Sequence, residues 1–349
     1  MTIHIGLIGG GNISQTHARA VKTIVGAEVA AVFGTNQKKV AQLCSEFGGK
    51  PYEKLESFLR HRPMDMVAIG SPSGLHAAHG ISAAEHGLHV LVEKPLDINT
   101  ERADAVIAAA EAAGVKLGVM FQDRLKPSIQ QLRKWLASGG LGKIFFIDAQ
   151  VKWYRPAEYY SGSKWRGTLA LDGGGALINQ AVHTVDLLLW LFGDVVRVQA
   201  RTATLLHQIE AEDTAVAIVE FASGALGVLH ATTAAYPGYP RRLEITGSEG
   251  TVIVEHDRVV AAQLRREQGE ESARQKLSVE IQPDNNQSAS SAVVSDFRGH
   301  QALFENFLRA IKENSAPVCD GHEGRRSVAL VEAIYCAARH PGSSVELPA

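Results

Sequence analysis

Apolar positions in the first third of the chain follow two alternating patterns, one typical of strands and one typical of helices. Short continuous apolar runs predict buried strands at residues 3–8, 28–33, 64–70, 89–92 and 115–121. Between these runs, apolar residues recur every three or four positions, which predicts helices at residues 17–25, 38–47, 76–86 and 101–113. Strands that alternate with helices favour a parallel sheet covered on both faces. The pattern therefore predicts a doubly wound α/β domain.

After about Gln122 the pattern changes to longer runs of strand character that follow a helix predicted at residues 128–137. These runs lie at residues 143–153, 195–204, 213–221, 225–233, 243–246 and 251–255. Short turns such as Ser223-Gly224 separate some of them, which indicates antiparallel pairing. Polar residues 282–295 predict a mobile loop, and helices are predicted at residues 301–314 and 325–339. We therefore expect an N-terminal α/β domain at residues 1–122 and an α+β domain at residues 123–349.

The composition is that of an ordinary globular protein, and it excludes several classes of function. A chain of 349 residues is long for one core, and 45% hydrophobic with 21% charged residues is unexceptional. The net charge of −2 gives no electrostatic basis for binding nucleic acid or a membrane surface. The most apolar stretch, residues 187–192, is too short to span a bilayer. Three widely spaced cysteines fit a reducing compartment, so we expect a cytoplasmic protein.

A glycine-rich turn follows the first predicted strand. Residues 9–14 read GGGNIS, which is close to G-x-G-x-x-G with Ser14 in the third glycine position. Gly9 and Gly11 permit a tight turn and a close approach of the backbone to a pyrophosphate, and the following helix supplies N–H groups. The motif predicts a dinucleotide site that includes Gly9, Gly11, Asn12 and Ile13. A glycine-rich turn without a ligand remains the alternative.

The end of the second predicted strand bears on the choice of cofactor. Residues 32–39 read VFGTNQKK and contain no acidic residue to bind the ribose 2′-hydroxyl of NAD. Thr35 and Lys38 could instead contact the 2′-phosphate of NADP, although Lys38 and Lys39 also fit a solvated helix face. We therefore expect NAD or NADP, with NADP slightly favoured.

Glu93-Lys94-Pro95 follows the apolar run at residues 89–92. A lysine at the carboxyl end of a buried parallel strand lies at the ligand crevice, where partial desolvation makes its ammonium available for chemistry. Pro95 fixes φ, and a cis bond before it would aim Lys94. An exposed lysine in a turn has the same local sequence, so the rest of the chain must decide between the two interpretations.

A second motif begins at glycines 173–175 and continues into a predicted helix. Asn179, His183 and Asp186 share one face of this helix. Such a face is either solvated surface or the wall of a pocket, and the glycines favour the pocket because they let a ligand approach the backbone. Histidine titrates near neutral pH, so His183 suits the acid/base that takes a hydroxyl proton as hydride leaves an alcohol. Lys94 would then stabilise the charge that develops on the same oxygen, and Asn179 would orient the substrate.

We expect no metal site. The histidines at positions 76, 79, 86 and 89 do not form a helical H-E-x-x-H motif or a comparable ligand set.

Together these motifs resemble the Gfo/Idh/MocA oxidoreductases. The resemblance covers nearly the whole chain and rests on Gly9-x-Gly11, Ser71-Pro72 with His76, Glu93-Lys94-Pro95, and Gly173-Gly174-Gly175 with His183 and Asp186. It implies a Rossmann domain, followed by an α/β domain whose open, mostly antiparallel sheet is often buried in homodimers or homotetramers.

The resemblance also implies that Lys94 and His183 flank the substrate beside the nicotinamide. It also implies that Lys94 contacts the cofactor, together with four further residues, Ser71, Pro72, His76 and Glu93. Many members have an aspartate four residues before the histidine. This chain has Asn179 there, which puts a carboxylate-assisted proton relay in doubt and leaves His183 as the stronger base candidate.

A finer resemblance connects the chain with sugar-nucleotide and glycoside 3-dehydrogenases. It rests on Trp153-Tyr154-Arg155, Tyr159-Tyr160, Trp165-Arg166-Gly167 and Asn179-Gln180. Aromatic rings stack on the C–H face of a sugar, and arginine binds a carboxylate or phosphate. The expected substrate contacts are Lys94, Gln122, Tyr154, Arg155, Trp165, Arg166, Asn179, His183 and Tyr236. Trp153 and Trp165 fit a core equally well, and Tyr239 and Arg241 fit either further contacts or an oligomer rim.

The sequence therefore predicts an NAD(P)-dependent dehydrogenase that acts on a CH–OH group of a sugar, a sugar derivative or a cyclic polyol. One alternative is a glycoside hydrolase that uses NAD for a transient oxidation. The other is a sensor of a dinucleotide or sugar without catalysis. The presence of both Lys94 and His183 argues against the sensor, because a sensor needs neither residue.

Overall fold

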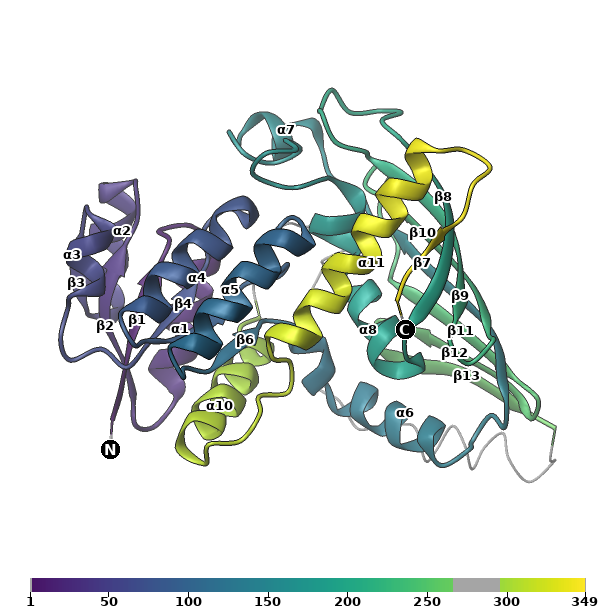
Figure 1. Ribbon diagram of the computed structural model, residues 1–349, viewed down its shortest axis with the longest axis horizontal. Helices are drawn as coiled ribbons and strands as arrows, with labels where there is room; N and C mark the ends of the chain where they lie inside the picture. The colour runs from purple at the N-terminus through teal and green to yellow at the C-terminus, as the bar shows by residue number, and fades with distance from the viewer. Residues whose placement is uncertain (1, 266–295, 349) are drawn as a thin grey trace. The chain divides into compact units, whose positions relative to one another are not determined.

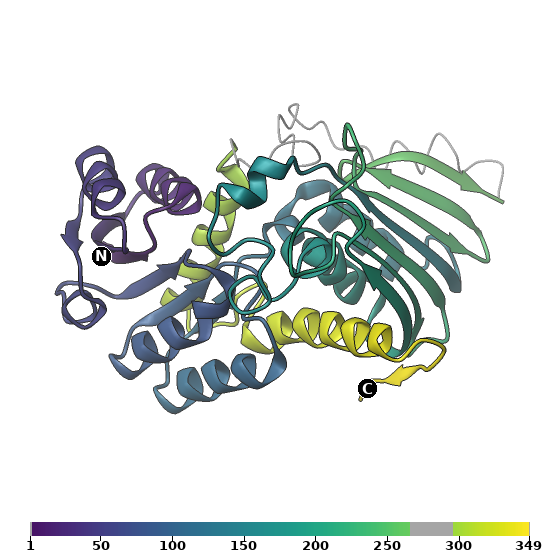
Figure 2. The same ribbon diagram turned by 90° about the horizontal axis from the view of Figure 1, so that it is seen from above.

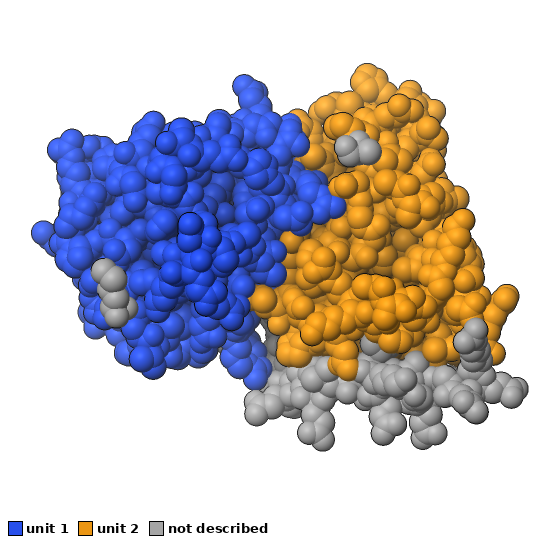
Figure 3. All heavy atoms as spheres, turned by 60° about the horizontal axis from the view of Figure 1, so that its bottom comes forward, with its two compact units in different colours: residues 1–122, 170–173, 293–328 blue, residues 123–169, 174–292, 329–349 orange. Residues whose placement is uncertain are grey.

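The computed structural model describes residues 2–265 and 296–348, and Figures 1 and 2 show the chain from two directions. The loop predicted at residues 282–295 lies outside the described residues. The chain divides into two compact units, which Figure 3 distinguishes by colour. Unit 1 comprises residues 1–122, 170–173 and 293–328, and unit 2 comprises residues 123–169, 174–292 and 329–349.

Unit 1 contains a six-stranded parallel sheet with the strand order β3-β2-β1-β4-β5-β6 (Figure 1). Its strands are β1 (Ile3–Ile8), β2 (Ala27–Phe33), β3 (Lys50–Tyr52), β4 (Met66–Ile69), β5 (His89–Val92) and β6 (Leu117–Val119). This is the strand order of a Rossmann fold, so the expected α/β domain is confirmed. The order reverses between β1 and β4, and the carboxyl ends of these strands mark the expected ligand crevice. The sequence pattern missed β3, because its three residues contain no continuous apolar run.

The described helices of unit 1 include two closely packed pairs. They are α1 (Asn12–Thr23), α2 (Gln37–Phe47), α3 (Leu55–Leu59), α4 (His76–Glu85), α5 (Thr100–Ala112), α10 (Arg298–Lys312) and the first part of α11 (Gly321–Arg339). Helix α1 packs against α10, and α4 packs against α5 (Figures 1 and 2). Asparagine side chains begin two of these helices, since Asn36 accepts a hydrogen bond from the Lys39 N–H and Asn99 accepts one from the Arg102 N–H.

Residues 293–328, which the sequence pattern assigned to the second domain, cluster with unit 1. The buried Phe304 of α10 meets the ring of His17 edge-on, with 5.6 Å between ring centroids. The buried Phe307 lies against Gly118 of β6, where an added Cβ would be only 2.8 Å from the ring. An amphipathic pattern shows that a helix covers a core, but it does not show which core.

Unit 2 contains an eight-stranded sheet with the order β13-β12-β11-β7-β10-β9-β8-β14. Its strands are β7 (Ile144–Lys152), β8 (Val195–Ala203), β9 (Thr214–Phe221), β10 (Leu226–Thr232), β11 (Arg242–Gly247), β12 (Gly250–Glu255), β13 (Arg258–Leu264) and β14 (Val345–Glu346). Strands β7 and β10 pair in parallel, and the other neighbouring pairs are antiparallel. The expected mostly antiparallel sheet is therefore confirmed.

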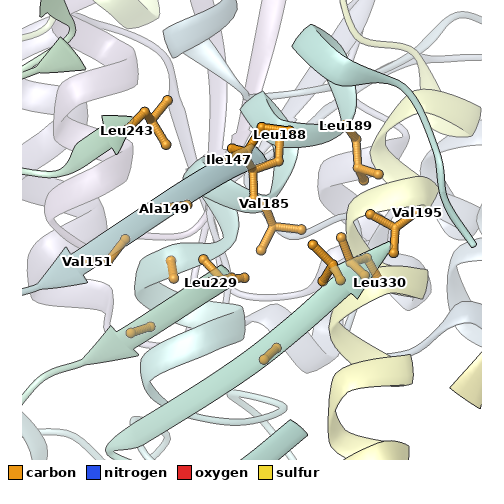
Figure 4. Close-up of a cluster of buried hydrophobic side chains, with 14 of the residues drawn as sticks. Ile147, Ala149, Val151, Val185, Leu188, Leu189, Val195, Leu229, Leu243 and Leu330 are labelled. Carbon is orange, nitrogen blue, oxygen red and sulfur yellow. The ribbon is translucent and has the colours of Figure 1, made fainter. Parts of the chain in front are cut away.

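One face of this sheet carries the core of unit 2 (Figure 4). Alternate residues of β7, namely Ile147, Ala149 and Val151, are buried on this face, as a half-buried strand requires. Side chains from α8 (Val182–Phe192) and from the second part of α11 cover them, including Val185 and Leu330. Helices α6 (Pro127–Ala137) and α7 (Ala157–Ser161) complete the unit. Among all described residues, we find no helix that is both long and apolar enough to cross a membrane.

Candidate active site

The glycine-rich turn joins β1 to α1 at the carboxyl edge of the parallel sheet. Gly9 has φ +127°, and a Cβ there would lie 2.7 Å from the Gly70 carbonyl oxygen, so a side chain does not fit. A Cβ at Gly11 would meet nothing within 4 Å. Helix α1 has no side-chain N-cap and no acidic residue in its first turn. The open side of Gly11 and the uncapped helix N-terminus fit the pyrophosphate of a dinucleotide.

Ser14 shows why this motif tolerates a residue other than its third glycine. Its side chain is fully buried, and its Oγ would lie 2.7 Å from a Cβ placed on Gly9. The same Oγ would lie 3.3 Å from a Cβ on Gly70. The position therefore requires a small side chain, and serine satisfies that requirement.

The end of β2 leaves the cofactor choice open. Thr35 and Lys38 are both exposed, while the neighbouring Asn36 side chain is engaged in capping α2. Residues 32–39 bring no carboxylate to this strand end. This segment therefore brings no negative charge that would repel a 2′-phosphate.

His76 links the loops that follow β4 and β5. Its Nε2 lies 2.9 Å from the carbonyl oxygen of Ser71, and its Nδ1 lies 2.8 Å from that of Pro95. Only 1% of the residue is exposed, and burial lowers the pKa of its imidazole. The ring therefore fixes the positions of Ser71 and Pro95, a structural role that the sequence did not indicate.

His79, one turn further along α4, gives unit 1 a pH-dependent stability. Its Nδ1 lies 2.9 Å from the Ser71 hydroxyl oxygen, and burial, with a smaller effect of His76, lowers the pKa of His79 from 6.5 to about 4. The unfolded chain therefore binds this proton near pH 6.5, whereas the folded chain does not until about pH 4. The resulting stabilisation is complete above pH 6.5 and is lost as the pH falls to about 4.

We expect His79→Gln to flatten the pH dependence of the free energy of unfolding between pH 6.5 and 4. One titrating group contributes up to about 1.4 kcal/mol per pH unit in such a window. Urea unfolding across this range measures the slope, and His86→Gln at the end of the same helix is the control. Identical slopes for His79→Gln and the wild type would contradict the assignment.

Two buried acids hold the loop that carries Lys94. Glu93 Oε1 lies 2.9 Å from His17 Nε2 and 3.2 Å from His300 Nε2. Burial alone would raise the pKa of Glu93, but the bonds from both histidines hold it well below its ordinary value. These three groups could also ligate a metal ion, but their separations are those of N–H···O hydrogen bonds. Asp97 accepts hydrogen bonds from the backbone N–H groups of Ala77 and Ile98.

Lys94 lies between these two anchors and is half-buried. The Lys94–Pro95 bond is cis, as the sequence analysis suggested. Glu93, expected among the cofactor contacts, instead points into the buried cluster with His17 and His300. No local pattern indicated this cluster, because His300 lies 207 residues after Glu93.

In unit 2, the glycines before His183 serve packing within the protein. A Cβ on Gly174 would lie 2.1 Å from the Tyr335 hydroxyl oxygen, and one on Gly175 would lie 2.0 Å from the Glu212 carbonyl oxygen. The Glu212 carboxylate accepts hydrogen bonds from the N–H groups of Gly175 and Leu177. The prediction that these glycines admit a ligand is wrong at Gly174 and Gly175, because protein atoms already occupy that space.

The helix that carries Asn179 and His183 changes its winding between them. Residues Ala176–Ala181 form a π-helical turn, and α8 starts at Val182. Such turns frequently occur at functional sites. Asn179 and His183 are both half-buried, whereas Asp186 is fully buried in a two-bond ion pair with Arg124, at 2.9 and 2.7 Å. Asp186 therefore anchors the helix and does not face a ligand.

An arginine and aromatic cluster adjoins Asn179. Arg155 donates a hydrogen bond of 2.8 Å to Gln180, and the Gln180 amide donates to the Tyr159 hydroxyl and to Asn179 Oδ1. The guanidinium of Arg166 lies over the Tyr159 ring, 4.2 Å from its centroid. Its Nε is buried and has no hydrogen-bond partner among the described residues. Both guanidinium groups thus lie over the Tyr159 ring, but Arg155 is only 2% exposed, so the half-buried Arg166 is the more accessible of the two.

The other aromatic candidates occupy different environments. Trp153 is 8% exposed and belongs to the core of unit 2, which agrees with its interpretation as a core residue. Trp165 is half-buried, with the Arg166 guanidinium 5.5 Å from its ring centroid. Tyr154 meets the exposed Tyr236 edge-on, with 5.2 Å between ring centroids.

Arg241 is buried in an ion-pair cluster, and its expected role as a ligand contact or at an oligomer rim stays a prediction. It is 9% exposed and donates a hydrogen bond of 2.8 Å to Asp123. It also pairs with Asp257, and Lys126 bridges both aspartates at 3.0 and 2.6 Å. His183 Nδ1 lies 3.9 Å from Asp123 Oδ2. Burial alone would raise the pKa of Asp123, but Lys126 and Arg241 hold it well below its ordinary value.

The predicted site residues thus gather in two groups. Gly9, Gly11, Ser71, Pro72 and Lys94 follow strands of the parallel sheet in unit 1. Gln122 also belongs to unit 1, where it lies against Gly299. Asn179, His183 and the arginine and aromatic cluster belong to unit 2. The prediction that Lys94 and His183 flank one substrate therefore stays a prediction.

A Rossmann unit with an open phosphate-binding turn, joined to a unit that presents an imidazole, defines a dinucleotide-dependent oxidoreductase. Residues 3–121 match the family model described as an oxidoreductase family with an NAD-binding Rossmann fold. Residues 129–253 match the GFO/IDH/MocA C-terminal domain. The chain belongs to the GFO/IDH/MocA family of oxidoreductases.

Relatives match over nearly the whole chain. The WlbA dehydrogenase from Bordetella pertussis, solved in complex with NADH and UDP-GlcNAcA, is 34% identical with a TM-score of 0.87, covering 100% of this chain and 98% of that one. D-apiose dehydrogenase from Paraburkholderia graminis is 28% identical, covering 98% of this chain and 88% of the relative. Myo-inositol 2-dehydrogenase from Thermotoga maritima is 25% identical, covering 94% of each.

Proposed function

We propose that this oxidoreductase transfers hydride between a nicotinamide and a secondary hydroxyl or keto carbon of a sugar derivative that carries a carboxylate or phosphate. The observation that carries the substrate class is the placement of Arg155 and Arg166 on one aromatic platform beside Asn179. Aromatic rings bind the apolar face of a sugar, and guanidinium groups bind carboxylates and phosphates with two parallel hydrogen bonds. The complex of the similar WlbA dehydrogenase with UDP-GlcNAcA supports this substrate class.

Each residue of the proposed site has a distinct chemical role. The Lys94 ammonium donates a hydrogen bond to the reacting oxygen and stabilises its negative charge. His183 takes the hydroxyl proton during oxidation and returns it during reduction. Asn179 orients the substrate, and Arg155 and Arg166 bind its anionic group, with Tyr154, Trp165, Tyr236 and Gln122 as further contacts. The bound nicotinamide supplies the acceptor or donor of hydride.

The dinucleotide is proposed to bind over the glycine-rich turn. Gly9, Gly11, Asn12 and Ile13 would hold the pyrophosphate, and Ser71 and Pro72 would line the nicotinamide side. Thr35 and Lys38 support a slight preference for NADP, because both are exposed at a strand end without a carboxylate. The NADH complex of the similar WlbA dehydrogenase instead supports NAD. A comparison of kcat/KM with the two cofactors decides between them.

The experiment that tests the function is a substrate panel assayed with both NAD and NADP. It contains inositols, free sugars, glycosides, sugar acids, sugar phosphates and sugar nucleotides. Steady formation of reduced nicotinamide, fastest with the anionic sugars, supports the proposal. Release of sugar from glycosides without net reduction of cofactor would indicate the hydrolase. Binding of a sugar or dinucleotide without turnover would indicate the sensor.

We also propose that the chain forms a homodimer or homotetramer through the outer face of the unit 2 sheet. Phe146, Val216, Ile218 and Leu226 are 40–53% exposed on this face. Phe146 pairs with Leu226, and β9 pairs with β10, so these side chains form one apolar surface. We expect sedimentation equilibrium to give at least twice the chain mass of 37.5 kDa. A monomer at micromolar concentration would contradict this assembly.

A further inference from the structure

The Asp123 carboxylate lies close to the imidazole of His183 within unit 2. Its Oδ2 lies 3.9 Å from His183 Nδ1, although the two residues are far apart in the sequence. We propose that Asp123 is a positioning residue that orients His183 and stabilises its protonated form. The expected effect of Asp123 on the reaction rate rests on the proposed function. Its contact with His183 rests only on the geometry within unit 2.

Asn179 does not provide this carboxylate. An amide carries no negative charge, so it stabilises an imidazolium far less than an ionised carboxylate does. Its oxygen also accepts a hydrogen bond of 3.2 Å from Gln180 Nε2, which turns the oxygen toward the arginine and aromatic cluster. The negative charge behind His183 therefore comes from a different element, the short 3₁₀ turn Gln122–Leu125.

Asp123 is held rigidly and in its ionised form. Arg241 Nη1 lies 2.8 Å from its Oδ2, and Lys126 Nζ lies 3.0 Å from its Oδ1. Both cations also pair with Asp257, so two carboxylates and two cations compensate one another in a buried cluster. The two cations already fix the carboxylate before substrate binds. Asp123 can therefore orient the ring without a further loss of side-chain entropy in each catalytic cycle.

This orientation assigns different tasks to the two nitrogens of His183. A carboxylate facing Nδ1 favours the tautomer with its proton on Nδ1, in which Nε2 is unprotonated and can act as the base. During oxidation the substrate O–H bond breaks, its proton passes to Nε2, and hydride leaves the carbon for the nicotinamide. The positive charge formed on the ring is stabilised by Asp123, and the proton is released to solvent afterwards. A gap of 3.9 Å is longer than a hydrogen bond, and such contacts often tighten only when substrate binds.

The first test compares Asp123→Asn with Asp257→Asn, each of which removes one carboxylate from the same cluster. Asp257 has φ +61°, a conformation that asparagine adopts readily, and it pairs with the same two cations. For Asp123→Asn we expect kcat to fall about 100-fold and KM to stay within about threefold. We also expect the acidic limb of the kcat/KM profile to move about one pH unit lower, because the imidazolium loses its counter-charge. Asp257→Asn should change each quantity much less.

The second test measures the tautomer of His183 in the wild-type chain, without any need for turnover. ¹⁵N-labelled histidine, assigned by comparison with His183→Gln, should show a proton on Nδ1 and none on Nε2 in the neutral form of the ring. Asp123→Asn should shift this equilibrium toward the other tautomer. The inference is overturned if the wild type carries the proton on Nε2, or if the two aspartate variants have equal kinetics. If no panel substrate is turned over but the tautomer shifts as expected, the proposed function fails and the positioning role stands.

Discussion

We expect Lys94→Met to lower kcat at least about 1,000-fold while the affinity for the dinucleotide changes by less than about threefold. Methionine keeps the apolar stem of lysine but has no ammonium to stabilise the charge on the reacting oxygen, and one such donor accounts for about a 100- to 1,000-fold effect. Dinucleotide binding should persist, because the glycine-rich turn and α1 do not include Lys94.

The kinetic assay uses the best substrate from the panel, and fluorescence titration with reduced cofactor measures binding. Lys116→Met is a matched control, because Lys116 precedes the amino end of the neighbouring strand β6, at the opposite edge of the sheet. The control should keep wild-type kcat. If Lys94→Met retained more than about a tenth of the wild-type rate, Lys94 would not be the group that stabilises the reacting oxygen.

Arg124→Leu should lower the free energy of unfolding of unit 2 by about 3–5 kcal/mol. Arg124 and Asp186 are each only 1% exposed, and the guanidinium binds both carboxylate oxygens. Removal of one partner leaves an uncompensated buried charge, which is the costly way to disrupt a buried ion pair. Because Asp186 lies one turn after His183 on α8, the substitution should also reduce turnover.

The double variant Arg124→Leu with Asp186→Leu separates the two contributions to this cost. It removes both charges, so much of the lost stability should return. Arg197→Leu provides the comparison, because Arg197 is 51% exposed and pairs with Glu220 at 3.1 Å, and exposed pairs contribute less than about 1 kcal/mol. Chemical unfolding followed by near-UV circular dichroism measures all three variants. Equal losses for Arg124→Leu and Arg197→Leu would show that burial does not govern the strength of the pair.

Local patterns in the sequence were enough to predict most of the fold. The apolar runs of β1, β4 and β5 and the glycine-rich turn are contiguous, so their physical causes lie within a few residues. Most long strands of unit 2 were equally visible, because alternation along a half-buried strand is also local. The pattern missed the edge strands β3, β13 and β14, and it did not show that α10 covers the core of unit 1.

The candidate site was less predictable, because several of its contacts join distant segments. Asp123 and Arg241 are 118 residues apart, and no local pattern connects them. The glycines before His183 were visible, but the reason for them was not, since Glu212 and Tyr335 come from other segments to occupy the space. The sequence thus predicts Lys94 and His183 as candidate reactive residues, whereas the partners that hold the surrounding groups in place became visible only in three dimensions.

The division of unit 1 into separate stretches of sequence limits how this fold can be recombined. A fragment that ends at Gln122 would contain the whole parallel sheet and the glycine-rich turn, but it would lack α10. Glu93 would then lose His300, and His17 would lose the ring of Phe304. A gene fusion with a single crossover after residue 122 would therefore not transfer the complete nucleotide-binding unit.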